Sequence, residues 1–192
     1  MSLLIIGLAL FLGAHSISII NSPWRDRVVA RVGLVPWQAM FGVVSLTGLV
    51  LVVLGYGMAR NALDPIVLYD PPTWTRHLNL VLMLPVFPLL LAAYLPGRIQ
   101  RAVKHPMLLA VKIWAFGHLL ANGTLADVLL FGSFLAWAVA DRVSLKRRTP
   151  IPVHGAPPGA KNDVIAVVGG LLFYLSFVFV LHRWLIGVSP LA

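Results

Sequence analysis

Long apolar stretches separated by short polar segments dominate this chain. Most of the stretches approach the ~20 residues that a transmembrane helix needs. We therefore predict an all-α integral membrane bundle and, with no internal repeat in view, a single transmembrane domain over residues 1–192. The first stretch resembles a signal-peptide core but lacks a basic segment before it, so we expect it to remain as the first helix. The six predicted spans are Ser2–Ile20, Trp37–Met58, His77–Leu95, Pro106–Ala121, Thr124–Ala140 and Val164–Leu181.

The polar segments between the spans alternate in charge. The first, third and fifth loops are strongly basic, whereas the second, the fourth and the C-terminal tail are not. Because basic loops stay on the cytoplasmic side, we predict that both termini lie on the non-cytoplasmic side. The basic residues of the three loops are Arg25, Arg27 and Arg31, then Arg98, Arg101 and Lys104, and finally Arg142, Lys146, Arg147, Arg148 and Lys161.

Composition supports a membrane protein and excludes several kinds of chemistry. The chain is 59% hydrophobic and only 11% charged, and its mean hydropathy is +0.91. The net charge of +9 is explained by the basic loops, so we expect the lipid bilayer as a partner and no nucleic acid. With no cysteine, the chain has no disulfide and no thiolate metal site. It also lacks glutamate, so six aspartates are its only carboxylate side chains.

Local signals predict how neighbouring spans begin and meet. Asn122 and Gly123 are suited to a tight turn with positive φ angles. Thr124 can cap the following helix, with Asp127 in the capping-box position. Small residues suited to close helix packing form two stripes, Gly7, Ala14 and Ser18 in the first span and Gly42, Ser45 and Gly48 in the second.

Two histidines fall well inside predicted spans. At a rise of about 1.5 Å per residue, His15 lies about 20 Å below the outer surface and His118 about 18 Å above the inner one. In an apolar layer of about 30 Å their depths differ by roughly 8 Å. Two imidazoles on different helices at comparable depth suit the axial ligation of a b-type heme. Trp114, one turn from His118, is expected on the same helix face.

Other roles for the polar side chains stay open at this point. A buried histidine can instead bond a neighbouring helix, or serve in a proton relay or another metal site. His105 precedes Pro106, which is typical of a helix start, although His105 is also a candidate site residue. Lys112 is expected to extend toward the inner headgroups. His154 falls in the long fifth loop.

Four stretches of the chain carry a family resemblance. They are GLALFLGAHS at 7–16, KHPMLLAVKIWAFGHLLANG at 104–123, LLFGSFLAWA at 129–138 and HRWLIGVSP at 182–190. Together they resemble the NnrU family, which includes the plant and bacterial 15-cis-zeta-carotene isomerases. The spacing of His-Pro and His-Leu-Leu-x-Asn-Gly is the most specific marker.

The resemblance implies a multi-span membrane protein carrying heme b, whose ferrous iron promotes cis-to-trans isomerisation of a hydrophobic polyene. The ligand histidines of that family fall on His15 and His118 here, and His105 matches a further family histidine. Trp114 and Asn122 are supporting candidates beside them. Whether the chain is catalytic at all is left open. The chain has no long N-terminal extension of the plant type, so we expect a multi-pass protein of the bacterial cytoplasmic membrane.

Two alternatives accompany the isomerase interpretation. Other NnrU proteins are linked to nitric oxide and nitrite reduction, which implies a non-enzymatic accessory protein of a larger respiratory or photosynthetic membrane complex. The stretch RAVKHPM also resembles a segment of S-adenosylmethionine-dependent membrane methyltransferases. Those enzymes carry paired glutamates after that segment, and this chain has none.

Overall fold

The computed structural model describes residues 1–148 and 155–191. Within these residues the chain forms helices and an isolated bridge between Val67 and Thr124, which confirms the predicted all-α class. The helices gather into two compact units, one made of Met1–Tyr69 and Thr124–Thr149 and the other of Asp70–Gly123 and Pro150–Ala192. The single domain over residues 1–192 stays a prediction.

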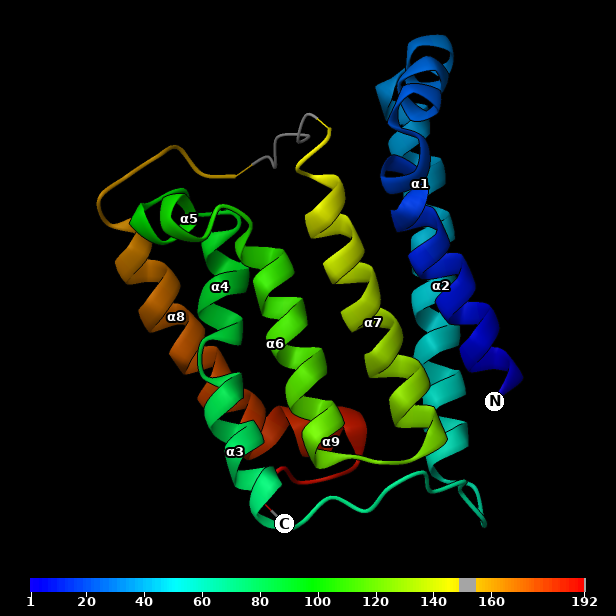
Figure 1. Ribbon diagram of the computed structural model, residues 1–192. Coiled ribbons are helices and arrows are strands. Elements are labelled where there is room, and N and C mark those ends of the chain that lie inside the picture. Colours follow the sequence, from blue (N-terminus) through cyan, green and yellow to red (C-terminus); the bar gives the residue numbers. More distant parts are fainter. Residues whose placement is uncertain (149–154, 192) are drawn as a thin grey trace. The chain divides into compact units, whose positions relative to one another are not determined.

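The first unit contains α1 (Ser2–Val32), α2 (Leu34–Arg60) and α7 (Leu125–Ser144). α1 lies along α2, and α7 contacts both (Figure 1). Gly33, with a φ of +90°, lets the chain reverse between α1 and α2.

Glycines allow the close approach of α1 and α2. A Cβ at Gly7 would lie 2.5 Å from a backbone nitrogen of α2, and one at Gly48 would lie 2.7 Å from a backbone nitrogen of α1. A Cβ at Gly55 would also meet the α1 backbone. The predicted stripes are therefore confirmed at Gly7 and Gly48. Gly42, in contrast, has no neighbouring atom within 4 Å of its Cβ position, and the contact at Gly55 was not foreseen.

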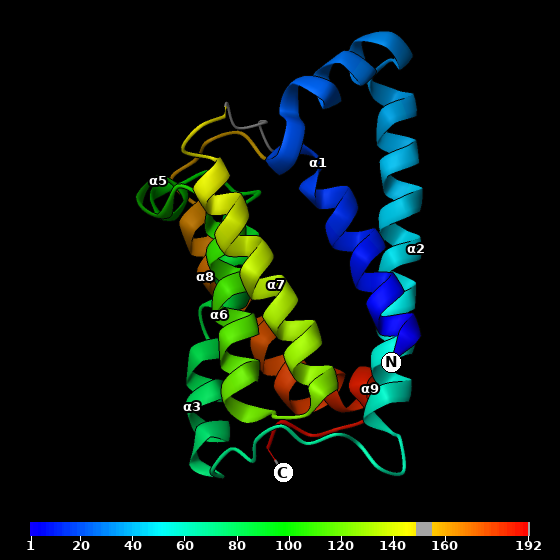
Figure 2. The same cartoon turned by 45° about the vertical axis from the view of Figure 1, so that its right-hand side comes forward.

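A break interrupts α1 directly after the predicted end of the first span. Asn21 has a φ of −151° and a ψ of 75°, so the helical hydrogen bonding stops there (Figure 2). Its Oδ1 accepts the Trp24 N–H at 2.9 Å and caps a second helical segment. Pro23 is tolerated in the first turn of that segment because its missing N–H would have no helical partner. The basic stretch that was predicted as a loop is therefore helical.

The second unit is built around α4, which contacts α6 and α8, while α3 also contacts α6. Its core contains Val86 and Leu89 of α4 and Ala110 of α6. The helices of this unit are α3 (Trp74–Met83), α4 (Val86–Ala92), α5 (Arg98–Val103), α6 (Pro106–Ala121), α8 (Asn162–Ser176), the π-helical turn η1 (Phe177–Leu181) and α9 (His182–Ile186).

A proline break divides the predicted span His77–Leu95 into α3 and α4. Pro85 has no N–H and its ring clashes with the preceding helical turn. The Leu84 N–H bonds the carbonyl three residues back at 3.2 Å, which leaves the Leu80 carbonyl without its usual helical donor. The Tyr174 hydroxyl of α8 donates to the Leu80 carbonyl at 2.9 Å. The break is therefore satisfied by a contact that also fixes α8 against α3.

Among the described residues, four segments are long and apolar enough to cross a membrane. They are Ser2–Val32, Leu34–Arg60, Trp74–Ala92 and Asn162–Ile186. α6 has the predicted bounds, but its 16 residues are fewer than the usual ~20. α7 has 20 residues and contains Asp127, Asp141 and Arg142. The fourth and fifth spans therefore stay predictions.

The predicted start of α7 is confirmed, and the predicted turn before it is wrong in detail. The side chain of Thr124 accepts the Asp127 N–H at 3.3 Å, and the Asp127 carboxylate accepts the Thr124 N–H at 2.9 Å. These two bonds form the expected capping box. Asn122, however, has an extended backbone with a φ of −140°, and neither it nor Gly123 has a positive φ.

Candidate functional site

A backbone hydrogen bond fixes the ring of His15 in α1. Its Nδ1 lies 2.7 Å from the carbonyl oxygen of Phe11, one turn earlier. Because a carbonyl oxygen only accepts, Nδ1 carries the proton and the lone pair of the neutral ring lies on Nε2. Nε2 makes no hydrogen bond within residues 1–148 and 155–191. Metal-binding histidines commonly show this arrangement, since the bond at one nitrogen orients the other.

Aromatic side chains from α1, α2 and α7 surround the His15 ring. Phe11 stacks on it with ring centroids 4.3 Å apart, and Phe41 meets it edge-on at 5.0 Å. Trp137 lies perpendicular to it at 5.9 Å. Phe41 and Trp137 could not be predicted from the sequence, because their approach to His15 depends on how the three helices pack, whereas Phe11 lies one turn from His15 in the same helix. Together they form an apolar surround for the imidazole, which stays partly exposed.

Two polar atoms on the helices around His15 are buried and have no hydrogen-bond partner among the described residues. One is the Trp137 Nε1, and the other is the Oγ of Ser45, which lies one turn from Phe41 on the same face of α2. Leaving such a group unsatisfied costs about 1–3 kcal/mol. The Trp137 N–H and the Ser45 hydroxyl are therefore available to hydrogen-bond a ligand bound near His15.

His118 in α6 repeats the geometry of His15. Its Nδ1 lies 2.8 Å from the Trp114 carbonyl oxygen, which again puts the lone pair of the neutral ring on Nε2. The Trp114 and His118 ring centroids are 5.5 Å apart, which confirms that the two share one helix face. Asn122 donates from Nδ2 to the His118 carbonyl at 2.9 Å and holds the last turn of α6.

His105 begins α6, as the sequence predicted. It is the N-cap residue, and Pro106 occupies the first helical position. Lys104 before it has a φ of +66°, the one positive φ outside glycine within residues 1–148 and 155–191. The direction in which α6 leaves its first residue is thus set by an unusual backbone turn.

The two predicted heme ligands belong to different units, His15 to the first and His118 to the second. Their pairing at one iron stays a prediction. The described part of the chain has no group of three or more His, Cys, Asp and Glu side chains that could hold a metal ion. An axially ligated heme needs only one or two protein side chains. His154 lies outside the described residues.

A polar cluster that the sequence did not predict surrounds Asp127 in the first unit. The Tyr56 hydroxyl donates to Asp127 Oδ1 at 2.6 Å, and the Thr124 hydroxyl donates to Oδ2 at 2.6 Å. Asp127 is only 5% exposed. Burial and then the negative charge of Asp127 raise the pKa of Tyr69 in the adjoining loop. The one sequence signal for the pair is that Tyr56 and Asp127 both lie near span ends predicted on the same membrane side.

Comparison with known proteins identifies a family. The family model described as NnrU protein matches residues 3–190, which takes in nearly the whole of both units. No curated protein and no solved structure matches the chain.

Proposed function

Because the chain belongs to the NnrU family, we propose that it is a heme-b-binding membrane protein similar to the zeta-carotene isomerases, with His15 and His118 as axial ligands. The observation that carries this proposal is the geometry that the two rings share. Each Nδ1 bonds the carbonyl four residues earlier, at 2.7 Å and 2.8 Å. Such a bond fixes the tautomer and makes Nε2 a better ligand.

The residues around His15 fit a porphyrin in two respects. The aromatic rings offer an apolar surround suited to the face of the macrocycle, and the unpartnered atoms of Ser45 and Trp137 offer polar contacts. When bound, ferrous heme supplies a Lewis-acid or one-electron centre that weakens the double-bond character of a polyene. The contribution of the chain is to orient the two imidazoles, exclude water and present apolar surface to a lipophilic substrate.

The proposed setting is the bacterial cytoplasmic membrane, with six spans and both termini on the non-cytoplasmic side. Four segments with the length and composition of spans support a multi-pass arrangement. The alternation of basic and non-basic loops supports the orientation. The fourth and fifth spans are proposed from their apolar composition alone.

Absorption spectroscopy tests the heme assignment. Protein purified from heme-replete cells is expected to show a Soret band that is lost in His15→Ala and in His118→Ala. His77→Ala, at an exposed position of α3, is the matched control and is expected to keep the band. Wild-type protein without any heme, or His15 and His118 variants with a full Soret band, would contradict the assignment.

A dark assay with tri-cis-zeta-carotene under reducing conditions tests the isomerase part separately. Wild-type protein is expected to convert the substrate, and the two histidine variants are not. A heme-loaded protein that leaves the polyene unchanged would contradict catalysis. Stable co-purification of such a protein with a larger respiratory or photosynthetic complex would instead favour the accessory function.

A further inference from the structure

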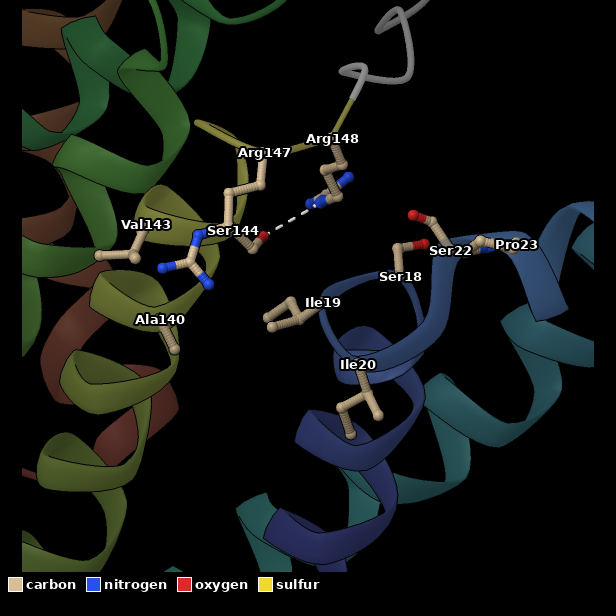
Figure 3. Close-up of a pocket in the computed structure, with 10 residues that line it drawn as sticks. All are labelled: Ser18, Ile19, Ile20, Ser22, Pro23, Ala140, Val143, Ser144, Arg147 and Arg148. Carbon is tan, nitrogen blue, oxygen red and sulfur yellow. Dashed lines mark hydrogen bonds between the residues drawn. The ribbon is translucent and has the colours of Figure 1, made fainter.

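A cavity of about 490 Å³ lies in the first unit, between the end of the apolar part of α1 and the last turn of α7 (Figure 3). Ile19, Ile20, Ala140 and Val143 make part of its wall apolar. Hydroxyl groups and two arginines make the rest polar. The lining is therefore amphipathic, and the cavity has no use in the proposed heme site.

The break in α1 shapes this cavity. At Asn21 the helix stops and restarts in another direction, so Ile20 is left 81% exposed beside the opening. Ser18 and Ser22 on either side of Ile20 present their hydroxyls toward the space between α1 and α7 (Figure 3).

The charge of the lining is positive and only partly neutralised. Arg148 forms an ion pair with Asp141, and its Nε donates to the Ser144 hydroxyl at 3.0 Å. Arg147 lines the cavity and forms no ion pair within residues 1–148 and 155–191, and its side chain runs back along α7 in Figure 3. None of the lining residues is acidic. The cavity thus presents one guanidinium without an ion pair among the described residues, together with the hydroxyls of Ser18 and Ser22. The Ser144 hydroxyl already donates to Asp141.

We propose that this cavity binds the headgroup of an anionic phospholipid, with Arg147 on the phosphate and the Ser18 and Ser22 hydroxyls on its remaining oxygens. A guanidinium pairs with phosphate oxygens through two parallel hydrogen bonds, and hydroxyls satisfy the others. The apolar wall takes the first part of the acyl chains.

The place of the cavity along the chain favours a phospholipid over free phosphate. It lies where the apolar part of α1 meets the basic segment with Arg25, Arg27 and Arg31, as a membrane–water boundary requires. Basic residues on the cytoplasmic side of a span attract anionic lipids. Inorganic phosphate would leave the apolar wall exposed to water. The inference goes beyond heme binding and does not depend on it.

Native mass spectrometry of the full-length protein in detergent tests the proposal. The protein is titrated with dioleoyl phosphatidylglycerol, and bound lipid is counted. Arg147→Gln is expected to weaken binding about tenfold, as for the loss of one charge-assisted pair. Arg142→Gln makes the same charge change on α7 outside the cavity and is expected to change the affinity less than about twofold. Equal losses in the two variants would mean diffuse attraction and would overturn the site.

Three further experiments distinguish the phospholipid site from a free-anion site and from a role of Arg147 in heme binding. Ala140→Phe fills the cavity without changing its charge and is expected to weaken lipid binding as well; unchanged binding would overturn the site. Inorganic phosphate at millimolar concentration is expected to leave the lipid in place, and displacement would identify a free-anion site instead. Arg147→Gln is expected to keep its melting temperature and any Soret band. Loss of heme with lipid binding intact would assign Arg147 to heme carboxylates and overturn the proposal.

Discussion

At the scale of single residues, Lys104 combines a strained backbone with a place next to a candidate site residue. Its φ of +66° and ψ of −44° form a γ-turn, closed by the His105 N–H on the Val103 carbonyl at 2.9 Å. This turn is unfavourable for a residue with a Cβ. The turn nevertheless sets the direction of the α6 axis, and α6 carries His118.

Lys104→Gly is expected to raise the free energy of unfolding by about 1 kcal/mol, because glycine adopts a positive φ without a Cβ clash. Denaturant unfolding of the detergent-solubilised protein measures the change. Lys112→Gly, inside α6, is the control and is expected to lower stability by about 1 kcal/mol. A Lys104→Gly protein less stable than the wild type would contradict the γ-turn.

Tyr56→Phe is expected to destabilise the first unit by about 1–3 kcal/mol, because it leaves the buried Asp127 carboxylate short of a donor. The Tyr56 hydroxyl is 2.6 Å from Asp127 Oδ1. Thermal unfolding followed by circular dichroism measures the change. Tyr94→Phe removes an exposed hydroxyl from the second unit and is expected to alter stability by less than about 0.5 kcal/mol. Similar melting temperatures for the two variants would show that the bond to Asp127 contributes little.

At the scale of elements, close packing of α1 on α2 depends on which glycines face the partner helix. Gly55→Ala is expected to cost about 1–3 kcal/mol, since the new Cβ would meet α1 backbone that cannot move aside. Gly42→Ala, with open space around its Cβ position, is expected to raise stability by up to about 1 kcal/mol. Melting temperatures of the two variants should therefore move in opposite directions. If both melting temperatures moved in the same direction, the assignment of Gly55 to the α1-facing side of α2 and of Gly42 to the open side would be contradicted.

Prolines show how position within an element decides their effect. Pro85 separates α3 from α4, whereas Pro88, three residues later, lies inside α4. Pro88 is in the first turn of α4, where its missing N–H has no helical partner to lose. Tyr174→Phe is expected to cost about 1–3 kcal/mol, because the Leu80 carbonyl freed at the break then has no donor. Unfolding in denaturant checks this, and an unchanged midpoint would mean that water satisfies the carbonyl.

At the scale of the whole molecule, the side of the membrane on which the turn at 122–123 lies distinguishes six spans from four. α6 and α7 follow each other, so removing both spans would leave every other loop on its predicted side. The turn at 122–123 alone changes sides. Because the chain has no cysteine, single cysteines report their own location without background.

A Gly-Cys-Gly insertion after Asn122 is therefore expected to react with a membrane-impermeant maleimide in intact spheroplasts. Asp64→Cys, in the second loop, is expected to react under the same conditions. Ala102→Cys and Ala160→Cys, in the third and fifth loops, are expected to react only after lysis. Labelling of the Asn122 insertion only after lysis would leave four spans and contradict the six-span arrangement. Labelling of Ala102→Cys in intact cells would contradict the orientation.

The sequence by itself determined the apolar stretches, the basic loops and several helix starts. These features depend on local composition and on side chains a few residues apart, as with Thr124 and Asp127 or His105 and Pro106. The same holds for the ring orientations at His15 and His118, since the bonded carbonyls lie one turn away.

Only the tertiary structure decided which residues from distant parts of the chain meet. The contacts of His15 with Phe41 and Trp137, the Tyr56–Asp127 bond and the Tyr174–Leu80 bond join residues 26 to 122 positions apart along the sequence. The cavity at Arg147 likewise requires the break in α1 to face the end of α7. Hydrophobic periodicity does not predict such pairings, because one apolar helix face can pack against many others. Close packing of particular side chains determines which helices pair.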